Sequence, residues 1–166
     1  MRNTVFTFFL LILINAGLSY GQELPNLKSV KLNKKTSYKH AQPIVGKVVD
    51  YLFATPADRK NKARNEAGRF LVDWMNGTPD YVFYLEEKET HFFNTDADLL
   101  LMYMAALTKF SLAHSEVKEK QEQALGAMHL VLPYLYQHSD KKTWTKELWQ
   151  LYDASKNGKL EQFLYR

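Results

Sequence analysis

A run of nine apolar residues, Leu99 to Leu107, constrains the fold of this chain more than any other feature of its sequence. A membrane-spanning helix takes about 20 such residues, so this run is too short to cross a bilayer. Because every position is aliphatic or aromatic, a helix formed by the run has no polar face to turn toward water. We therefore predict a helix over 97–113, capped by Asn94, Thr95 or Asp96, at the centre of a helical fold.

Two amphipathic helices are expected before the central one, because apolar residues recur there at three- and four-residue spacing. The first opens at Pro43 and stops at Ala54, ahead of a proline. The second is capped by Thr55 and ends at an Asn-Gly pair, with Gly77 as its stop. Its basic residues, Arg64 among them, are expected mostly on a solvated face.

Two more helices are expected after the central one. One follows Ser115, and Pro133 should kink or end it. The other follows a turn at Ser139 and Asp140 and closes at Asn157-Gly158. The predicted fold class is all-α (mainly), a compact bundle of about five helices with short connections.

The segment around residues 81–93 breaks the helical pattern. Residues 81–85 are all aromatic, β-branched or leucine, which favours an extended segment over a helix. With a polar turn and the aromatic residues that follow, the segment would form a small β-hairpin. The Thr-Pro-Asp at 78–80 also fits the start of a helix, so both readings stay open. In the extended reading Tyr81, Phe83 and Leu85 face the core, while Val82 and Tyr84 face outward or meet the second arm of the hairpin.

The first residues have the pattern of a signal peptide. Arg2 precedes an apolar stretch, and small residues at Ser19 and Gly21 suit cleavage before Gln22. We expect export, with a periplasmic or extracellular destination after cleavage near Gly21–Gln22. The expected organisation is a signal peptide over 1–21, a flexible basic leader over 22–42 and a single helical domain over 43–166.

The net charge of +4 is unevenly distributed. The leader holds five lysines and one glutamate, whereas acidic and basic residues nearly balance from Pro43 onward. This distribution disfavours nucleic acid as a partner, since the excess of basic residues lies in the signal peptide and the leader and the domain is nearly neutral. The partners it suggests are another envelope protein, or an anionic envelope surface contacted through the leader.

The sequence contains no motif of a known catalytic, metal or phosphate site. It has no cysteine, and none of its five histidines stands three or four residues from another. Neither a nucleophile motif nor a glycine-rich phosphate loop is present. We expect no catalytic residues, no metal site and no cofactor.

Aromatic residues are the remaining candidates for function, because tyrosine and tryptophan are enriched at binding interfaces. The candidate ligand- or partner-binding residues are Trp74, Tyr81, Tyr84 and His91. The expected function is an exported, non-enzymatic helical binding or interaction protein. Two alternatives stay open: a small envelope hydrolase with a spatially assembled site, and an envelope-surface protein docked by its lysine-rich leader.

Overall fold

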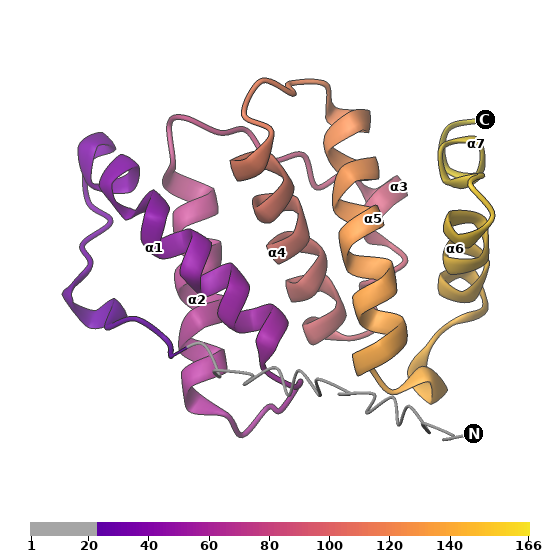
Figure 1. The fold of residues 1–166 in the computed structure, drawn as a ribbon, viewed down its shortest axis with the longest axis horizontal. Coiled ribbons are helices and arrows are strands. Elements are labelled where there is room, and N and C mark those ends of the chain that lie inside the picture. The colour runs from indigo at the N-terminus through magenta and orange to yellow at the C-terminus, as the bar shows by residue number, and fades with distance from the viewer. Residues whose placement is uncertain (1–22) are drawn as a thin grey trace, which may run out of the picture.

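The computed structural model describes residues 23–166, which form a helical bundle (Figure 1). The predicted signal peptide and its cleavage site lie outside the described residues. The described part holds seven α-helices, two short 3₁₀ helices and no strand, and none of its helices is both long and apolar enough to span a membrane. The elements are η1 Leu27–Ser29, α1 Lys35–Ala54, α2 Lys62–Gly77, α3 Glu87–Thr90, α4 Ala97–Ala113, α5 Lys120–His138, η2 Lys141–Thr143, α6 Lys146–Lys156 and α7 Leu160–Tyr165.

The apolar run forms the central helix, as predicted. Helix α4 packs on α5, α1 and α2, and Figure 1 shows it between α2 and α5, with α6 and α7 beyond α5. Met102 and Leu107 on α4 are buried on all sides. The Asp96 side chain accepts a hydrogen bond from the Asp98 amide and so begins the helix at the predicted place. With α1, α2, α4, α5 and α6 as its long members, the all-α bundle of five main helices is confirmed.

Helix α1 begins at Lys35, eight residues before the predicted start at Pro43. The Ser37 hydroxyl accepts hydrogen bonds from the Asn33 and Lys34 amides and starts the helix. Pro43 lies inside the helix on its exposed side, where water can reach the carbonyl that its missing N–H leaves free. The last eight residues of the expected leader, 35–42, are therefore helical. Its first half also contacts the domain, because Leu27 is buried in the core.

Helix α2 begins at Lys62, and the predicted cap at Thr55 is wrong. The Asn61 side chain is the cap, since it accepts a hydrogen bond from the Arg64 amide. Thr55 instead donates its hydroxyl to the Tyr51 carbonyl at the end of α1. Arg64, expected with the basic residues of a solvated face, is buried.

The β-hairpin over 81–93 does not form within the described residues. The chain from Tyr81 to Glu86 belongs to no helix or strand, and one helical turn, α3, follows it. Glutamates in the first turn of α3 favour the helix because its amino end carries partial positive charge. The expected second arm fails because Phe92 and Phe93 turn into the core, where they are buried.

Pro133 does not end helix α5, which continues to His138. The proline is exposed, so the carbonyl that its missing N–H leaves free can be hydrated. The helix begins at Lys120 after an N-cap at Glu119, four residues later than a cap at Ser115 would place it. Residues 114–119, which connect α4 to α5, therefore form a loop at the carboxyl end of α4.

Candidate functional site

Trp74 is the first of the four predicted binding residues, and it lies inside the protein rather than on its surface. The residue is fully buried, and its indole N–H donates a 2.9 Å hydrogen bond to the Tyr38 carbonyl. Its ring lies 5.6 Å from the Tyr81 ring and 6.0 Å from the Phe83 ring, measured between centroids. Trp74 thus anchors the chain that leaves α2 onto the bundle.

Tyr81 is held in place by this aromatic contact and by a hydrogen bond. Its hydroxyl accepts a 2.8 Å bond from the Gln42 side-chain amide on α1. Burial raises the pKa of Tyr81, and the nearby Asp80 carboxylate raises it further, while the hydrogen bond from Gln42 acts in the opposite direction. Tyr81 therefore stays a neutral phenol around pH 7, with its ring fixed against the bundle.

The residues after Tyr81 alternate between the bundle and the solvent. Phe83 is partly buried with its ring beside Tyr81, whereas Val82 is 61% and Tyr84 39% exposed. This period of two was predicted. The expectation that Leu85 faces the core is wrong, because it is 45% exposed. Three large apolar or aromatic side chains within four residues therefore meet water.

A pocket of about 300 Å³ lies between this segment and the turn from α4 to α5. We call it the segment pocket. The extended segment gives it one wall, the end of α4 and the start of α5 give the other, and the residues come from two parts of the chain about thirty positions apart. Its lining residues are Asp80, Tyr81, Val82, Tyr84, Ser111, Ser115, Val117, Lys118 and Gln123.

Two polar atoms that belong to this lining are buried without a hydrogen-bond partner in the described chain. They are the hydroxyl of Ser111 and the side-chain carbonyl oxygen of Gln123, in residues that are 2% and 5% exposed. A buried polar group without a partner costs roughly 1–3 kcal/mol, so such groups mark places where a ligand or an ordered water belongs. The Thr78 and Tyr103 hydroxyls and Glu89 Oε2 are unpaired as well, but Ser111 and Gln123 are the two such residues that line the segment pocket.

His91, the fourth predicted site residue, lies apart from the pocket. It is exposed at the end of α3, with its ring 3.7 Å from the Phe92 ring and its Nδ1 2.8 Å from the Glu87 carbonyl oxygen. Of the four candidates, the structure brings only Tyr81 and Tyr84 into one pocket. Sequence reasoning missed Ser111 and Gln123. The signal available was a serine on the buried side of an otherwise apolar helix.

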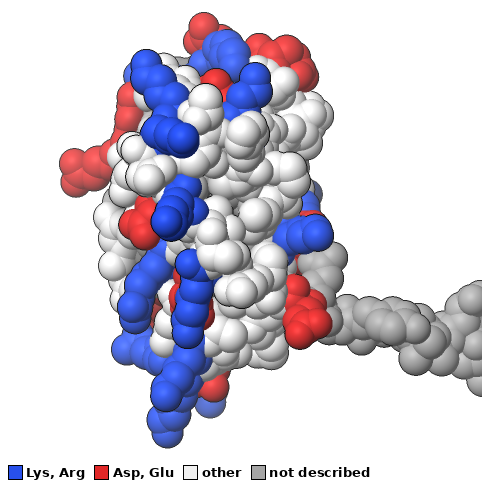
Figure 2. Space-filling view, turned by 90° about the vertical axis from the view of Figure 1, so that its left-hand side faces the viewer, with Lys and Arg blue, Asp and Glu red and all other residues white. Residues whose placement is uncertain are grey.

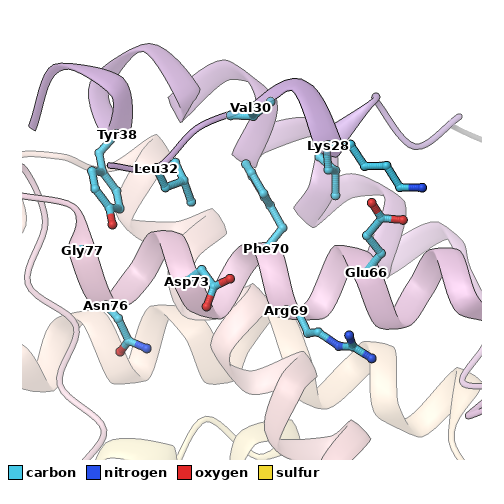
Figure 3. A pocket seen from close by; sticks show the side chains of 11 residues that line it. Lys28, Val30, Leu32, Tyr38, Glu66, Arg69, Phe70, Asp73, Asn76 and Gly77 are labelled. Carbon is cyan, nitrogen blue, oxygen red and sulfur yellow. The ribbon is translucent and has the colours of Figure 1, made fainter. Parts of the chain in front are cut away.

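A larger groove of about 670 Å³ runs between η1, the chain after it and α2 (Figure 3). We call it the leader groove. Val30, Leu32 and Phe70 form its apolar side, and Arg69 and Asp73 project from α2 at its rim. Both charged residues are exposed, so water already satisfies their hydrogen bonds. The residues that line the leader groove therefore lack the buried, unpaired polar atoms that are found in the segment pocket.

Residues 23–166 contain no group of three histidine, aspartate or glutamate side chains close enough to hold a metal ion. A hydrolytic triad of Ser111, His114 and Asp98 is not assembled, because Ser111 and His114 lie at one end of α4, whereas Asp98 lies at the other and binds Arg64. Comparison of the chain with protein-family models, curated protein sequences and solved structures finds no match.

Proposed function

We propose that this protein is an exported helical binding protein that captures a partner through residues 80–85 and the segment pocket. The observation that carries the proposal is the exposure of Val82, Tyr84 and Leu85 beside a pocket with two buried, unpaired polar atoms. Aromatic and apolar side chains around a small polar centre are typical of interfaces that lose water on binding. Export rests on the signal-peptide pattern of residues 1–21.

Binding fits the pocket better than catalysis does. The Ser111 hydroxyl makes no hydrogen bond to a base within residues 23–166, so nothing there activates it as a nucleophile. The pocket's charged residues, Asp80 and Lys118, are exposed at the rim and are not paired with each other. An exposed carboxylate lacks the burial that general acids use.

A photo-crosslinking experiment tests the proposal. A crosslinking phenylalanine analogue is placed at Tyr84 or at Tyr136, which is 39% exposed like Tyr84 but lies on α5. Illumination in the producing cells should give a discrete crosslinked species at position 84, and Val82→Asp should abolish it. Equal crosslinking at both positions, or crosslinking at 84 that survives Val82→Asp, would show that this surface is not the binding site.

The leader supports a second candidate function, docking on an anionic surface. Lys28, Lys31, Lys34, Lys35 and Lys39 are all exposed, and none forms an ion pair with another described residue. In Figure 2, Lys and Arg side chains run down one side of the face that is formed by the N-terminal elements. Each lysine near an anionic membrane contributes about 1 kcal/mol to binding.

Vesicle sedimentation tests this second candidate. The protein is mixed with vesicles of phosphatidylglycerol and phosphatidylcholine at low and high salt. Replacing Lys28, Lys31 and Lys35 by glutamine should lower binding by about tenfold per 1.4 kcal/mol lost. The matched control replaces Lys142, Lys146 and Lys156, exposed lysines at the opposite end of the molecule, and should leave binding unchanged. Equal loss in both sets would point to net charge alone, and no binding at low salt would remove the candidate.

A further inference from the structure

The amide of Gln123 has one orientation in the segment pocket, and this fixes what the pocket offers a ligand. Its Nε2 donates a 3.0 Å hydrogen bond to the Val117 carbonyl, which leaves Oε1 as the unpaired atom. The opposite orientation would set two acceptor oxygens against each other. The buried end of Gln123 therefore presents an acceptor, and a ligand must bring an N–H or O–H donor to it.

The chain along the pocket offers unpaired backbone groups as well. Between Asp80 and Leu85, no backbone N–H or C=O forms a hydrogen bond with any residue from 23 to 166. Side chains from Asp80 to Tyr84 alternate outward and inward, the spacing of a β-strand, and the exposed Leu85 ends the alternation. An extended chain with free backbone groups is the surface to which another extended peptide adds by main-chain hydrogen bonds.

The rim of the pocket carries charges of opposite sign. Asp80 comes from the segment and Lys118 from the turn before α5, and both are exposed. No ion pair within the described chain occupies either of them. A peptide with a basic residue on one side of its central residue and an acidic residue on the other complements this rim, and the order of the two charges selects its direction.

We infer that the segment pocket binds an extended peptide of a partner protein, which pairs with residues 81–85 and inserts an asparagine or glutamine side chain toward Gln123 and Ser111. This inference rests on the proposed function and names its ligand. A carboxamide brings an N–H donor for Gln123 Oε1 and an acceptor for the Ser111 hydroxyl. Leucine would leave both atoms unpaired, aspartate would set its charge against an acceptor, and lysine would lose hydration without a buried counter-charge.

Capped heptapeptides test the inference directly. The peptides alternate valine and threonine, carry lysine and glutamate at either side of a varied central residue, and are made in both charge orders. Binding to the purified protein is measured by chemical-shift titration. Peptides with central asparagine or glutamine should bind about tenfold or more tightly than those with leucine, aspartate or lysine, the factor that one lost hydrogen bond of roughly 1.4 kcal/mol gives. N-methylation of alternate peptide bonds should abolish binding.

Variants and hydrogen exchange locate the binding. Gln123→Met should remove the preference for the carboxamide, and Ser111→Ala should weaken it. Gln121→Met, at an exposed glutamine on the same helix, should change nothing. The amides of Val82 and Tyr84 should exchange at least about ten times more slowly with peptide bound, because alternate N–H groups of an extended segment point to the same edge and can then donate to the peptide backbone.

The inference would be overturned if the affinity did not depend on the central residue, if N-methylated peptides still bound, or if bound peptide did not slow the exchange of these amides. The crosslinking at position 84 is a separate measurement. If it succeeds while every heptapeptide fails to bind, the surface binds a partner of another kind and only the peptide inference is lost. If crosslinking at position 84 also fails, the proposed function is lost with it.

Discussion

Arg64 on α2 is bound to Asp98 on α4, with 2.7 Å between Nη2 and Oδ1, although Arg64 is only 2% exposed. The Nη1 of the same guanidinium donates to the carbonyls of Leu52, at 2.7 Å, and Thr55, at 2.8 Å, where α1 ends. The cation thus meets the partial negative charge at the end of α1 and a carboxylate in the first turn of α4. One side chain joins three helices.

Arg64→Met should therefore destabilise the protein strongly. The substitution keeps much of the apolar volume but leaves the Asp98 carboxylate and two carbonyls without their donor. Removing one partner of a buried ion pair costs about 3–5 kcal/mol. Urea unfolding measures the change, with Arg69→Met as a control at an exposed arginine of the same helix. The control should stay within about 0.5 kcal/mol of the wild type. Equal stability of the two variants would contradict the structural role of Arg64.

Truncation of Leu107 should cost much more than truncation of Leu100. Leu107 is 1% exposed on α4, and a fully buried leucine replaced by alanine costs about 2–5 kcal/mol. Leu100 is only partly buried, so its loss should fall at or below the lower end of that range. Val82→Ala, at a position that is 61% exposed, should have little effect. Thermal unfolding of the three variants gives the order, and a reversal of Leu107 and Leu100 would show that the packing of α4 is misplaced.

Ser111→Ala should leave the free protein as stable as the wild type or up to about 1 kcal/mol more stable. The Ser111 hydroxyl is buried without a partner, so its removal ends a desolvation cost, and alanine also favours the helix. Thr108→Val is the contrast, because the buried Thr108 hydroxyl donates a 3.0 Å bond to the Met104 carbonyl. That variant should lose about 1 kcal/mol. A clear loss of stability in Ser111→Ala would mean that its hydroxyl is already satisfied.

Stability should fall as pH rises above about 10, the ordinary pKa of tyrosine. Burial raises the pKa of Tyr103, which is fully buried, and that of Tyr165, whose hydroxyl donates a 2.9 Å bond to Glu89. Above about pH 10 the unfolded chain releases these two protons, whereas the folded protein keeps them. The stability that the two protonated tyrosines contribute is therefore fully present below the unfolded pKa and is lost as pH rises toward the raised pKa of the folded state.

The measurement is the melting temperature from about pH 8 to pH 11. Replacing both Tyr103 and Tyr165 by phenylalanine should flatten the alkaline decline, because neither position then has a proton to release. The single variant Tyr165→Phe also leaves the Glu89 carboxylate without its donor, so it should be less stable at every pH. An alkaline decline as steep in the double variant as in the wild type would assign the effect to other groups.

The central helix could be predicted because its signals are local. The run from Leu99 to Leu107 and the cap at Asp96 lie within a few residues of the helix they define. The starts of α1 and α2 could not be predicted this way. Pro43 and Thr55 carry boundary signals of their own, but the chain before Pro43 packs on the bundle and keeps the helix intact. A favourable tertiary contact outweighs a local preference of a kilocalorie or two.

The aromatic half of the candidate site was visible in the residue types, and the polar half was not. Tyr81 and Tyr84 attract attention in any sequence, and their alternation was read correctly. Ser111 and Gln123 are ordinary residues on helices until the fold makes them line one pocket with residues 80–84. The amino-acid sequence by itself determined which segments are helical at their centres and which helix is buried. Only the tertiary structure decided which polar atoms lose water without gaining a partner, because that depends on segments about thirty residues apart coming into contact.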